Sequence, residues 1–132
     1  MSLVVDASVV VAALLDTGPA GSWAQRLLAQ EDLAAPHLMP AEVASILRRL
    51  IRSGDVSSDL ASLALADVGF LPVAYFPFDP FADRVWQLRD NVTAHDAWYV
   101  ALAEELAAPL VTLDLRLGRA SGPRCEMRTP PG

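Results

Sequence analysis

Short apolar segments alternate with longer helical patterns along this chain of 132 residues, and this alternation limits its fold more than any other feature. Residues 3–6 predict a short buried strand, because apolar residues there would face both sides of a sheet. Further strands are predicted at 33–40, 71–77 and 109–113. Helices are predicted at 8–15, 20–30, 40–53, 57–68, 80–88 and 115–120, and from Thr93 onward. The order favours a three-layer α/β/α fold with a mostly parallel sheet of about four to five strands.

Size and composition indicate a single domain covering residues 1–132, in which only a short tail, about 128–132, is expected to fray. The chain is 53% hydrophobic, which is enough to close one core. No apolar segment approaches the roughly 20 residues of a membrane span, and no secretory signal is recognised. Cys125 is the single cysteine, which excludes an internal disulfide and fits a reducing compartment. The expected location is therefore the cytoplasm.

The net charge of −6 argues against binding a polyanion by bulk electrostatics. All ten basic residues are Arg, which suits phosphate recognition, but a GC-rich genome explains this composition better. Only the positions of the Arg residues therefore carry information. The total charge also misleads if the acids are clustered, because one or two bound divalent cations would bring it to about −4 or −2.

Four acidic residues occupy positions that an α/β fold would bring to one edge of the sheet. Asp6 and Asp114 follow predicted strands, and Glu42 and Asp96 lie in the first turns of predicted helices. Ligands of open α/β sheets bind beyond the carboxyl ends of the strands, where these helices begin. Carboxylates about 4 Å apart repel each other by roughly 4 kcal/mol at an effective dielectric of about 20. The gathering predicts a bound cation, and oxygen ligands favour Mg2+ or Mn2+, which could activate water for attack on a phosphodiester.

Helix capping is the competing explanation, because the helix macrodipole favours an acid in any first turn. Thr93 and Asp96 fit a capping box, and Asp114 would cap the last helix. Taken singly, each acid is more often a cap than a ligand. Capping does not explain Asp6, which ends a buried strand where an unpaired charge is unfavourable. The four acids together favour a shared metal site.

Three segments carry these acids in a recognisable order. They are VVDASVVVAALL at 4–15, AEVASILRRLIRSG at 41–54 and NVTAHDAWYVALAEELAAPLVTLDLRL at 91–117. Each is a weak signal alone, but the ordered set resembles the PIN-domain ribonucleases, and among them the VapC toxins of bacterial toxin–antitoxin pairs. The resemblance covers nearly the whole chain and implies a PIN-like fold.

The resemblance implies that Asp6, Glu42, Asp96 and Asp114 form an acidic quartet that binds Mg2+, with Mn2+ able to substitute. The implied activity is Mg2+-dependent endoribonuclease cleavage of RNA phosphodiesters by metal-activated water, without a covalent enzyme intermediate and commonly leaving a 3'-hydroxyl.

Further residues and partners also follow from the resemblance. Ser8 and Thr112 match positions close to the metal, whereas His95 departs from the aromatic residue that related toxins commonly carry there. The implied partners are an RNA substrate, a second copy in a homodimer, and a cognate VapB-type antitoxin. The C-terminal segment of such an antitoxin lies over the acidic pocket and often presents a basic side chain to it. No membrane partner is expected.

Several Arg residues are candidates for contacts to RNA phosphates. Arg49 and Arg52 share a helix stripe with Glu42, and Arg116 and Arg119 follow Asp114 closely. A solvated surface explains Arg49 and Arg52 equally well, and it is the favoured interpretation for the other two.

The histidines and aromatic residues carry weaker signals. His95 could shuttle a proton, but the favoured interpretation is an ordinary first-turn residue, and His37 is a still weaker candidate. Trp23, Trp86 and Trp98 could stack RNA bases, although packing in the core or in an interface is favoured for all three. Leu60, Leu63, Ala64 and Asp67 begin an amphipathic helix whose apolar side could pair with a second copy, with a partner helix or with its own core.

Two other function classes compete with the endoribonuclease. A non-catalytic PIN-like module would bind RNA or antitoxin without cleaving. A receiver-type phospho-acceptor domain is also built around a Mg2+ pocket. Its sequence would carry two adjacent acids early in the chain and a Lys near the last strand, and this chain has no Lys.

Overall fold

The computed structural model describes residues 2–132, and within them it contains one sheet of five strands, all parallel, in the order β3-β2-β1-β4-β5. The strands are β1 (Ser2–Val5), β2 (Asp32–Pro36), β3 (Val73–Phe76), β4 (Leu110–Val111) and β5 (Met127–Arg128). Strand β1 is central, because Leu3 is in register with Leu33 of β2 and Val4 with Leu110 of β4. The predicted α/β fold with a parallel sheet is confirmed.

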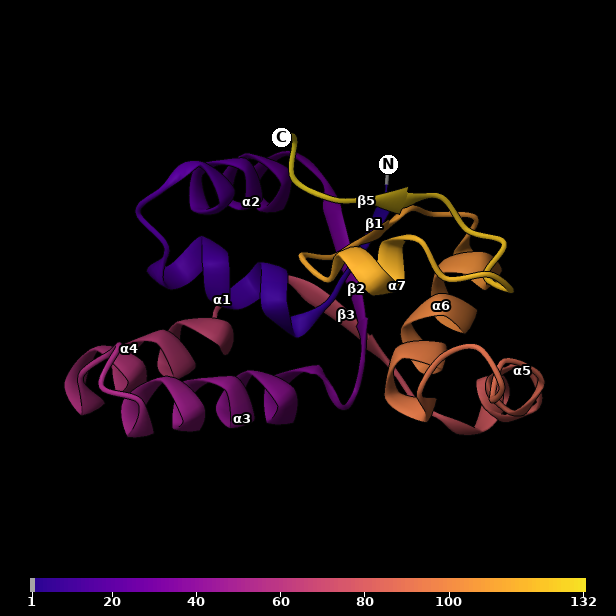
Figure 1. Ribbon diagram of the computed structural model, residues 1–132, viewed down its shortest axis with the longest axis horizontal. Helices are drawn as coiled ribbons and strands as arrows, with labels where there is room; N and C mark the ends of the chain where they lie inside the picture. Colours follow the sequence, from indigo (N-terminus) through magenta and orange to yellow (C-terminus); the bar gives the residue numbers. More distant parts are fainter. Residues whose placement is uncertain (1) are drawn as a thin grey trace.

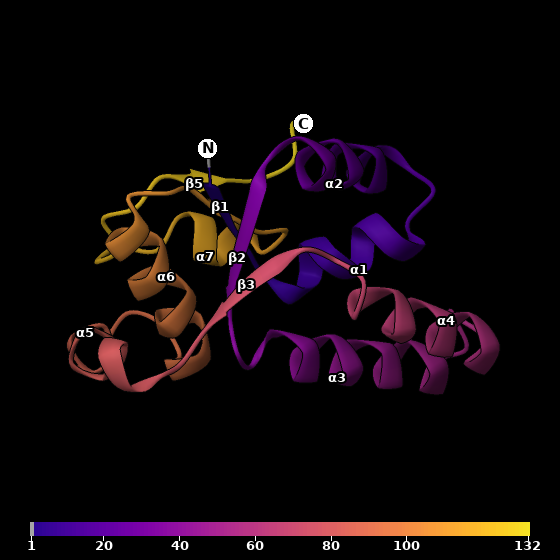
Figure 2. The same cartoon turned by 180° about the vertical axis from the view of Figure 1, so that it is seen from behind.

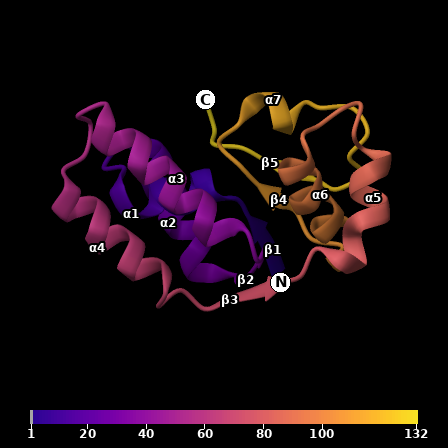
Figure 3. The ribbon, with the colours of Figure 1, turned by 90° about the horizontal axis from the view of Figure 1, so that it is seen from below.

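Helices cover both faces of this sheet. They are α1 (Ala7–Leu15), α2 (Pro19–Gln30), α3 (Met39–Arg52), α4 (Ser58–Val68), the 3-10 turn η1 (Asp79–Phe81), α5 (Ala82–Gln87), α6 (Ala94–Leu106) and α7 (Leu115–Gly118). Helices α1 to α4 lie on one side of the strands, and α5 and α6 lie on the other (Figures 1 and 2). The view from below shows the same three layers (Figure 3). Among residues 2–132, no helix is both long enough and apolar enough to cross a lipid bilayer.

The core lies on both sides of β1. Leu3, Val4 and Val5 are fully buried, which explains why this strand has no polar face. Helix α1 contributes Val9 and Val10 to the core, and α6 contacts β1, β2 and β4 from the other layer. The carboxyl end of β1 is therefore fixed between two packed helices. This packing determines the position of Asp6, the next residue in the chain.

The structure corrects two boundaries near the C-terminus. The predicted strand 109–113 is shorter, because β4 ends at Val111 and the next residues connect it to α7. Strand β5 was not predicted at all, and Arg128 was placed in the frayed tail. The two residues of β5 have no apolar pattern of their own, so only pairing identifies the strand. The Thr112 N–H donates to the Arg128 carbonyl at 3.0 Å, and the Leu110 N–H donates to the Glu126 carbonyl at 2.9 Å.

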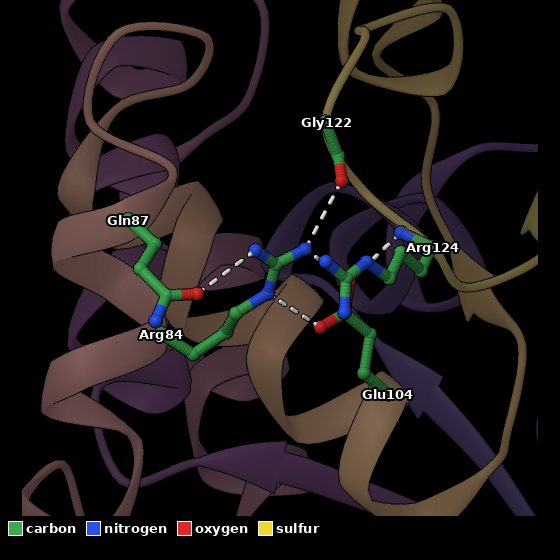
Figure 4. A network of polar contacts seen from close by, with 5 residues as sticks. All are labelled: Arg84, Gln87, Glu104, Gly122 and Arg124. Atoms are coloured by element: carbon green, nitrogen blue, oxygen red, sulfur yellow. Dashed lines mark hydrogen bonds and ion pairs between the residues drawn. The ribbon is translucent and has the colours of Figure 1, made fainter.

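An ion pair joins α5, α6 and the segment that leads to β5 (Figure 4). Arg84 Nε donates to Glu104 Oε1 at 2.7 Å, and Arg84 Nη2 donates to Glu104 Oε2 at 3.0 Å. Arg84 Nη2 also donates to the Gly122 carbonyl at 3.0 Å, and the Arg124 N–H donates to Glu104 Oε2 at 2.8 Å. Burial raises the pKa of Glu104, but these hydrogen bonds outweigh it and hold that pKa below its ordinary value. Bidentate charged pairs of this kind fix geometry as well as adding energy.

Candidate functional site

All four predicted acids line one cavity of about 510 Å³, which we call the acidic cavity. Asp6 directly follows β1, and Asp114 lies between β4 and α7. Glu42 and Asp96 lie in the first turns of α3 and α6. These elements begin or end at the same edge of the sheet, where the parallel strands present their carboxyl ends. The structure thus brings together side chains that are up to 108 positions apart in the sequence.

Asp6 is the most constrained of the four. Its Oδ1 accepts hydrogen bonds from Ser8 Oγ at 2.6 Å and from the Val9 N–H at 3.1 Å, and its Oδ2 accepts one from Thr112 Oγ1. Burial raises the pKa of Asp6, the three hydrogen bonds lower it, and repulsion by Asp96 raises it again, so that the balance is above the ordinary value. A carboxylate in this position is fixed in orientation but is unfavourable while charged.

Asp6 does cap a helix, contrary to the prediction from the sequence. Asp6 is the N-cap of α1, because its side chain accepts the hydrogen bond of the Val9 N–H. Capping nevertheless uses only one of the three hydrogen bonds to this carboxylate, since Ser8 and Thr112 supply the other two. The cap was not predicted because Asp6 was assigned to the strand 3–6, whereas β1 ends at Val5 and α1 begins at Ala7.

Ser8 and Thr112 connect the two strand ends. Besides donating to Asp6, Ser8 Oγ accepts from the Leu113 N–H at 3.1 Å, and Thr112 Oγ1 accepts from the Asp114 N–H at 3.0 Å. Thr112 is fully buried. These two hydroxyls therefore hold Asp6 and the backbone of Asp114 at a fixed separation.

Glu42 is positioned by a residue that the sequence analysis did not single out. Tyr99 is buried in α6, and its hydroxyl donates to Glu42 Oε1 at 2.5 Å. Burial, followed by the contact with Glu42, raises the pKa of Tyr99, so that its hydroxyl remains a donor. A signal was present in the sequence, because Tyr99 follows Asp96 by three positions and lies on the same helix face. His95 Nδ1 lies 4.0 Å from the other Glu42 oxygen, and its side chain is largely exposed.

Asp96 and Asp114 complete the row of acids. Burial raises the pKa of Asp96, the hydrogen bond with Thr93 lowers it, and repulsion by Asp114 raises it further, which leaves it above the ordinary value. Asp114 Oδ1 accepts from the Arg116 N–H at 2.9 Å and from the Leu117 N–H at 3.3 Å, so it caps α7 as expected. Asp6 is repelled by Asp96, and Asp96 is repelled by Asp114. Three carboxylates are thus electrostatically coupled.

The donors around the acidic cavity suit a hard cation. They are carboxylate oxygens, the ligands that Mg2+ and Mn2+ prefer. Within residues 2–132, however, no group of three or more His, Cys, Asp or Glu side chains stands ready in a metal-binding arrangement. The acids border the cavity without converging on one point. This fits a Mg2+ ion, which is commonly held by one or two carboxylates and keeps several of its waters.

The candidate Arg residues lie in different places. Arg49 lines the acidic cavity, and Arg116 lines a second cavity that shares Asp96 and Asp114 with the first. Arg52 is exposed near the end of α3 and is not among the residues that line either cavity. Arg119 lines neither of these cavities, and it donates to the Leu115 carbonyl at 3.1 Å.

The remaining candidates do not enter the acidic cavity. His37 follows β2 and contacts the Tyr75 ring edge-on. Trp23 packs against the core, and Trp98 packs edge-on against Phe78 with 5.3 Å between ring centroids. Trp86 is 68% exposed, so it does not pack in the core of its own chain, and packing in an interface stays a prediction.

The amphipathic helix predicted near residue 60 is α4, and its side chains separate into two faces. Leu60 and Leu63 are exposed, whereas Ala61, Ala64 and Val68 are buried. The larger apolar residues of α4 therefore do not enter the core of their own chain.

Comparisons with known proteins agree with this fold. The PIN domain family model matches residues 3–123. Ribonuclease VapC1 of Mycobacterium tuberculosis (strain ATCC 25618 / H37Rv) is 43% identical over 126 residues, which cover 95% of each chain. Ribonuclease VapC9 of the same strain is 41% identical over 129 residues, which cover 98% of each chain.

Solved structures show the same fold. PAE2754 from Pyrobaculum aerophilum superposes with a TM-score of 0.73 at 24% identity, over 96% of this chain and 83% of that chain. VapBC2 from Rickettsia felis, crystallised with a DNA fragment from its promoter, gives a TM-score of 0.67 at 13% identity, over 99% and 100%. The chain therefore belongs to the PIN domain family and, within it, to the VapC group.

Proposed function

We propose that this protein is an endoribonuclease that depends on a divalent cation, Mg2+ with Mn2+ able to substitute, and that acts as the toxin of a toxin–antitoxin pair. The observation that carries the proposal is that Asp6, Glu42, Asp96 and Asp114 line one cavity. The names of the relatives support it, because both VapC1 and VapC9 are described as ribonucleases.

In this proposal the cation lies among the four carboxylates, of which one or two would bind it directly, and the groups around them keep the carboxylates in place. A divalent ion bound there supplies activation of water and neutralisation of charge on the phosphodiester. Ser8 and Thr112 fix the orientation of Asp6, and Tyr99 fixes Glu42 through its hydroxyl. Because Tyr99 keeps its proton, Glu42 Oε1 faces a permanent donor, and the other oxygen of Glu42 lies 4.0 Å from His95 Nδ1.

The proposed antitoxin would cover the acidic cavity and the apolar groove beside it. Val11, Leu15, Ile46 and Leu50 line this groove, and Arg49 lies between it and the acidic cavity. An apolar segment that ends in a basic side chain suits both surfaces, because the basic group would meet the carboxylates. The partner is proposed from the resemblance to the VapC toxins, and VapBC2 from Rickettsia felis and FitAcB from Neisseria gonorrhoeae share the fold.

The test is cleavage of a single-stranded RNA in Mg2+ by the parent protein, Asp6→Asn and Asp96→Asn. We expect the parent to cut in Mg2+ or Mn2+ and to stop in EDTA. Both variants should lose at least about 100-fold in rate, because each removes a charged ligand. Asp59→Asn is the matched control, since Asp59 is exposed in the first turn of α4 and lies outside the acidic cavity.

The same experiment separates the proposal from the alternative of a non-catalytic binding module. Such a module would bind RNA or antitoxin equally well in the parent and in both variants, and no protein would cut. Cleavage that survives EDTA, or equal cleavage by the parent and Asp96→Asn, would contradict the metal-dependent mechanism. Melting temperatures of all variants confirm that each is folded.

A further inference from the structure

A second cavity of about 500 Å³ shares Asp96 and Asp114 with the acidic cavity. We call it the arginine cavity, because Arg89 and Arg116 line it together with Asn91, Thr93 and Ala120; Asp90 also contributes. Its wall comes from the loop between α5 and α6, from the start of α6 and from α7. Asp96 and Asp114 belong to both cavities, so they lie at the boundary between them.

The two guanidinium groups of the arginine cavity are available for a ligand. Within residues 2–132, neither Arg89 nor Arg116 makes an ion pair with a carboxylate, unlike Arg84 and Arg128. Arg89 is instead held over the exposed ring of Trp86, with 4.6 Å from its guanidinium carbon to the ring centroid, and it donates to the Trp86 carbonyl at 2.8 Å. A stacked guanidinium loses less freedom on binding than a mobile one, and it keeps further donors for phosphate oxygens.

The loop between α5 and α6, which forms part of the wall of the arginine cavity, packs against the segment around Gly122. Gly122 has a φ of +104°, and a Cβ at this position would overlap the Asn91 side chain. The carbonyl of Gly122 accepts from Arg84, which is itself paired with Glu104 (Figure 4). The segment around Gly122 therefore packs against the loop that carries Arg89 and Asn91, and this packing limits how far the loop can move.

The charges around the arginine cavity indicate when it would attract an anion. Three carboxylates, Asp90, Asp96 and Asp114, outnumber the two guanidiniums. A divalent cation held by Asp96 and Asp114 would reverse this balance and leave a positive surface that continues away from the acids. Attraction for phosphate should therefore be strong only when the cation is present.

We infer that the arginine cavity is a subsite for the RNA backbone on one flank of the scissile phosphate, with Arg89 and Arg116 each contacting a phosphate. The inference rests on the proposed endoribonuclease function, and it adds a direction to the substrate path. The RNA crosses Asp96 and Asp114, with one flank in the acidic cavity and the other in the arginine cavity.

The test measures RNA binding and cleavage by the parent protein, Arg89→Ala, Arg89→Lys and Arg116→Ala in Mg2+ at several KCl concentrations. Binding is followed by the fluorescence anisotropy of a phosphorothioate RNA, and cleavage by steady-state kinetics on the unmodified RNA. Each Ala variant should raise the Kd and KM about tenfold at low salt, change kcat little, and reduce the slope of log Kd against log salt by about one. Arg89→Lys should recover the salt slope, because it keeps the charge.

Arg26→Ala is the matched control, since Arg26 is exposed on α2, in the helical layer opposite α5 and α6 (Figure 1). Ala variants of Arg89 and Arg116 that bind RNA with the same Kd and salt slope as Arg26→Ala would overturn the inference, even if the parent cuts RNA normally. A parent that does not cut RNA would contradict the proposed function instead, and the anisotropy measurement would still decide whether the arginine cavity binds the backbone.

Discussion

At the scale of single residues, the site is built from carboxylates that are held in place and are unfavourable when charged. Ser8, Val9 and Thr112 donate to Asp6, yet its pKa remains above the ordinary value, because burial and Asp96 oppose these hydrogen bonds. The pKa of Asp96 is raised for the same kind of reason, by burial and then by Asp114. Acids arranged in this way lower the folding stability of the protein when no cation is bound. A lower stability of this kind is common for preorganised sites.

The raised pKa of Asp96 predicts that Asp96→Asn is more stable than the parent in EDTA at neutral pH. Folding favours the protonated acid, so the parent loses stability as the pH rises from the ordinary pKa of 3.8 through the raised folded value. Below pH 3.8 both side chains are neutral and this electrostatic difference should vanish. The measurement is the difference in Tm between the two proteins from pH 3 to pH 8.

Asp59→Asn serves again as the control, because Asp59 is exposed and does not line the acidic cavity. The prediction would be contradicted if the Tm difference between Asp96→Asn and the parent did not change with pH. It would also be contradicted if Asp96→Asn were less stable than the parent at pH 7.

At the scale of elements, the site depends on how segments distant in sequence meet at one edge of the sheet. The connection from β4 to α7 carries Thr112 and Asp114, and the Ser8 hydroxyl ties this connection to the start of α1. The loop between α5 and α6 is placed by a different contact, between Asn91 and Gly122. The turn at Gly122 and the pair between Arg84 and Glu104 thus support the loop that carries Arg89.

Gly122→Ala should destabilise the protein more than Gly54→Ala. Both glycines have positive φ, +104° and +81°, so each substitution strains the backbone by roughly 1 kcal/mol or more. A methyl group at Gly122 also overlaps Asn91, whereas one at Gly54 meets nothing within 4 Å. Urea unfolding should give about 1 to 2 kcal/mol of additional loss for Gly122→Ala. Equal losses in the two variants would show that Asn91 moves aside without cost.

At the scale of the whole molecule, the surface combines a net charge of −6 with exposed apolar side chains on and just beyond α4, which we call the α4 face. Leu60 is 55% exposed, Leu63 is 63% exposed, and Phe70, just beyond α4, is 87% exposed. Apolar side chains grouped in this way commonly mark a protein interface. This face lies on the layer of α1 to α4, away from α7 (Figures 1 and 3).

We predict that the protein is a homodimer through the α4 face and that Leu63→Glu is a monomer. Light scattering coupled to size-exclusion chromatography gives the mass of each. The control is Leu115→Glu, because Leu115 is 54% exposed but lies on α7. A Leu63→Glu protein that elutes as a dimer, or a parent that is monomeric at all concentrations, would contradict the prediction.

The sequence by itself determined the alternation of strands and helices, the parallel sheet and the identity of the four acids. These features depend on local patterns: apolar runs buried on both faces, helical spacing, and acids at predicted strand ends and helix starts. The sequence also indicated the family, because its motifs are ordered along the chain.

Only the tertiary structure decided how the acids are held and what lies beside them. The hydrogen bond from Tyr99 to Glu42 and the pairing of β5 with β4 join separate segments of the chain. The spacing of Tyr99 from Asp96 indicates a shared helix face, but it does not identify Glu42 as the partner of Tyr99, and β5 has no apolar pattern of its own. The exposure of Trp86, the overlap between Asn91 and a Cβ at Gly122, and the arginine cavity depend on the packing of α5, α6 and the C-terminal segment. Local sequence fixes which groups a chain carries, whereas burial and long-range contacts fix which of them meet.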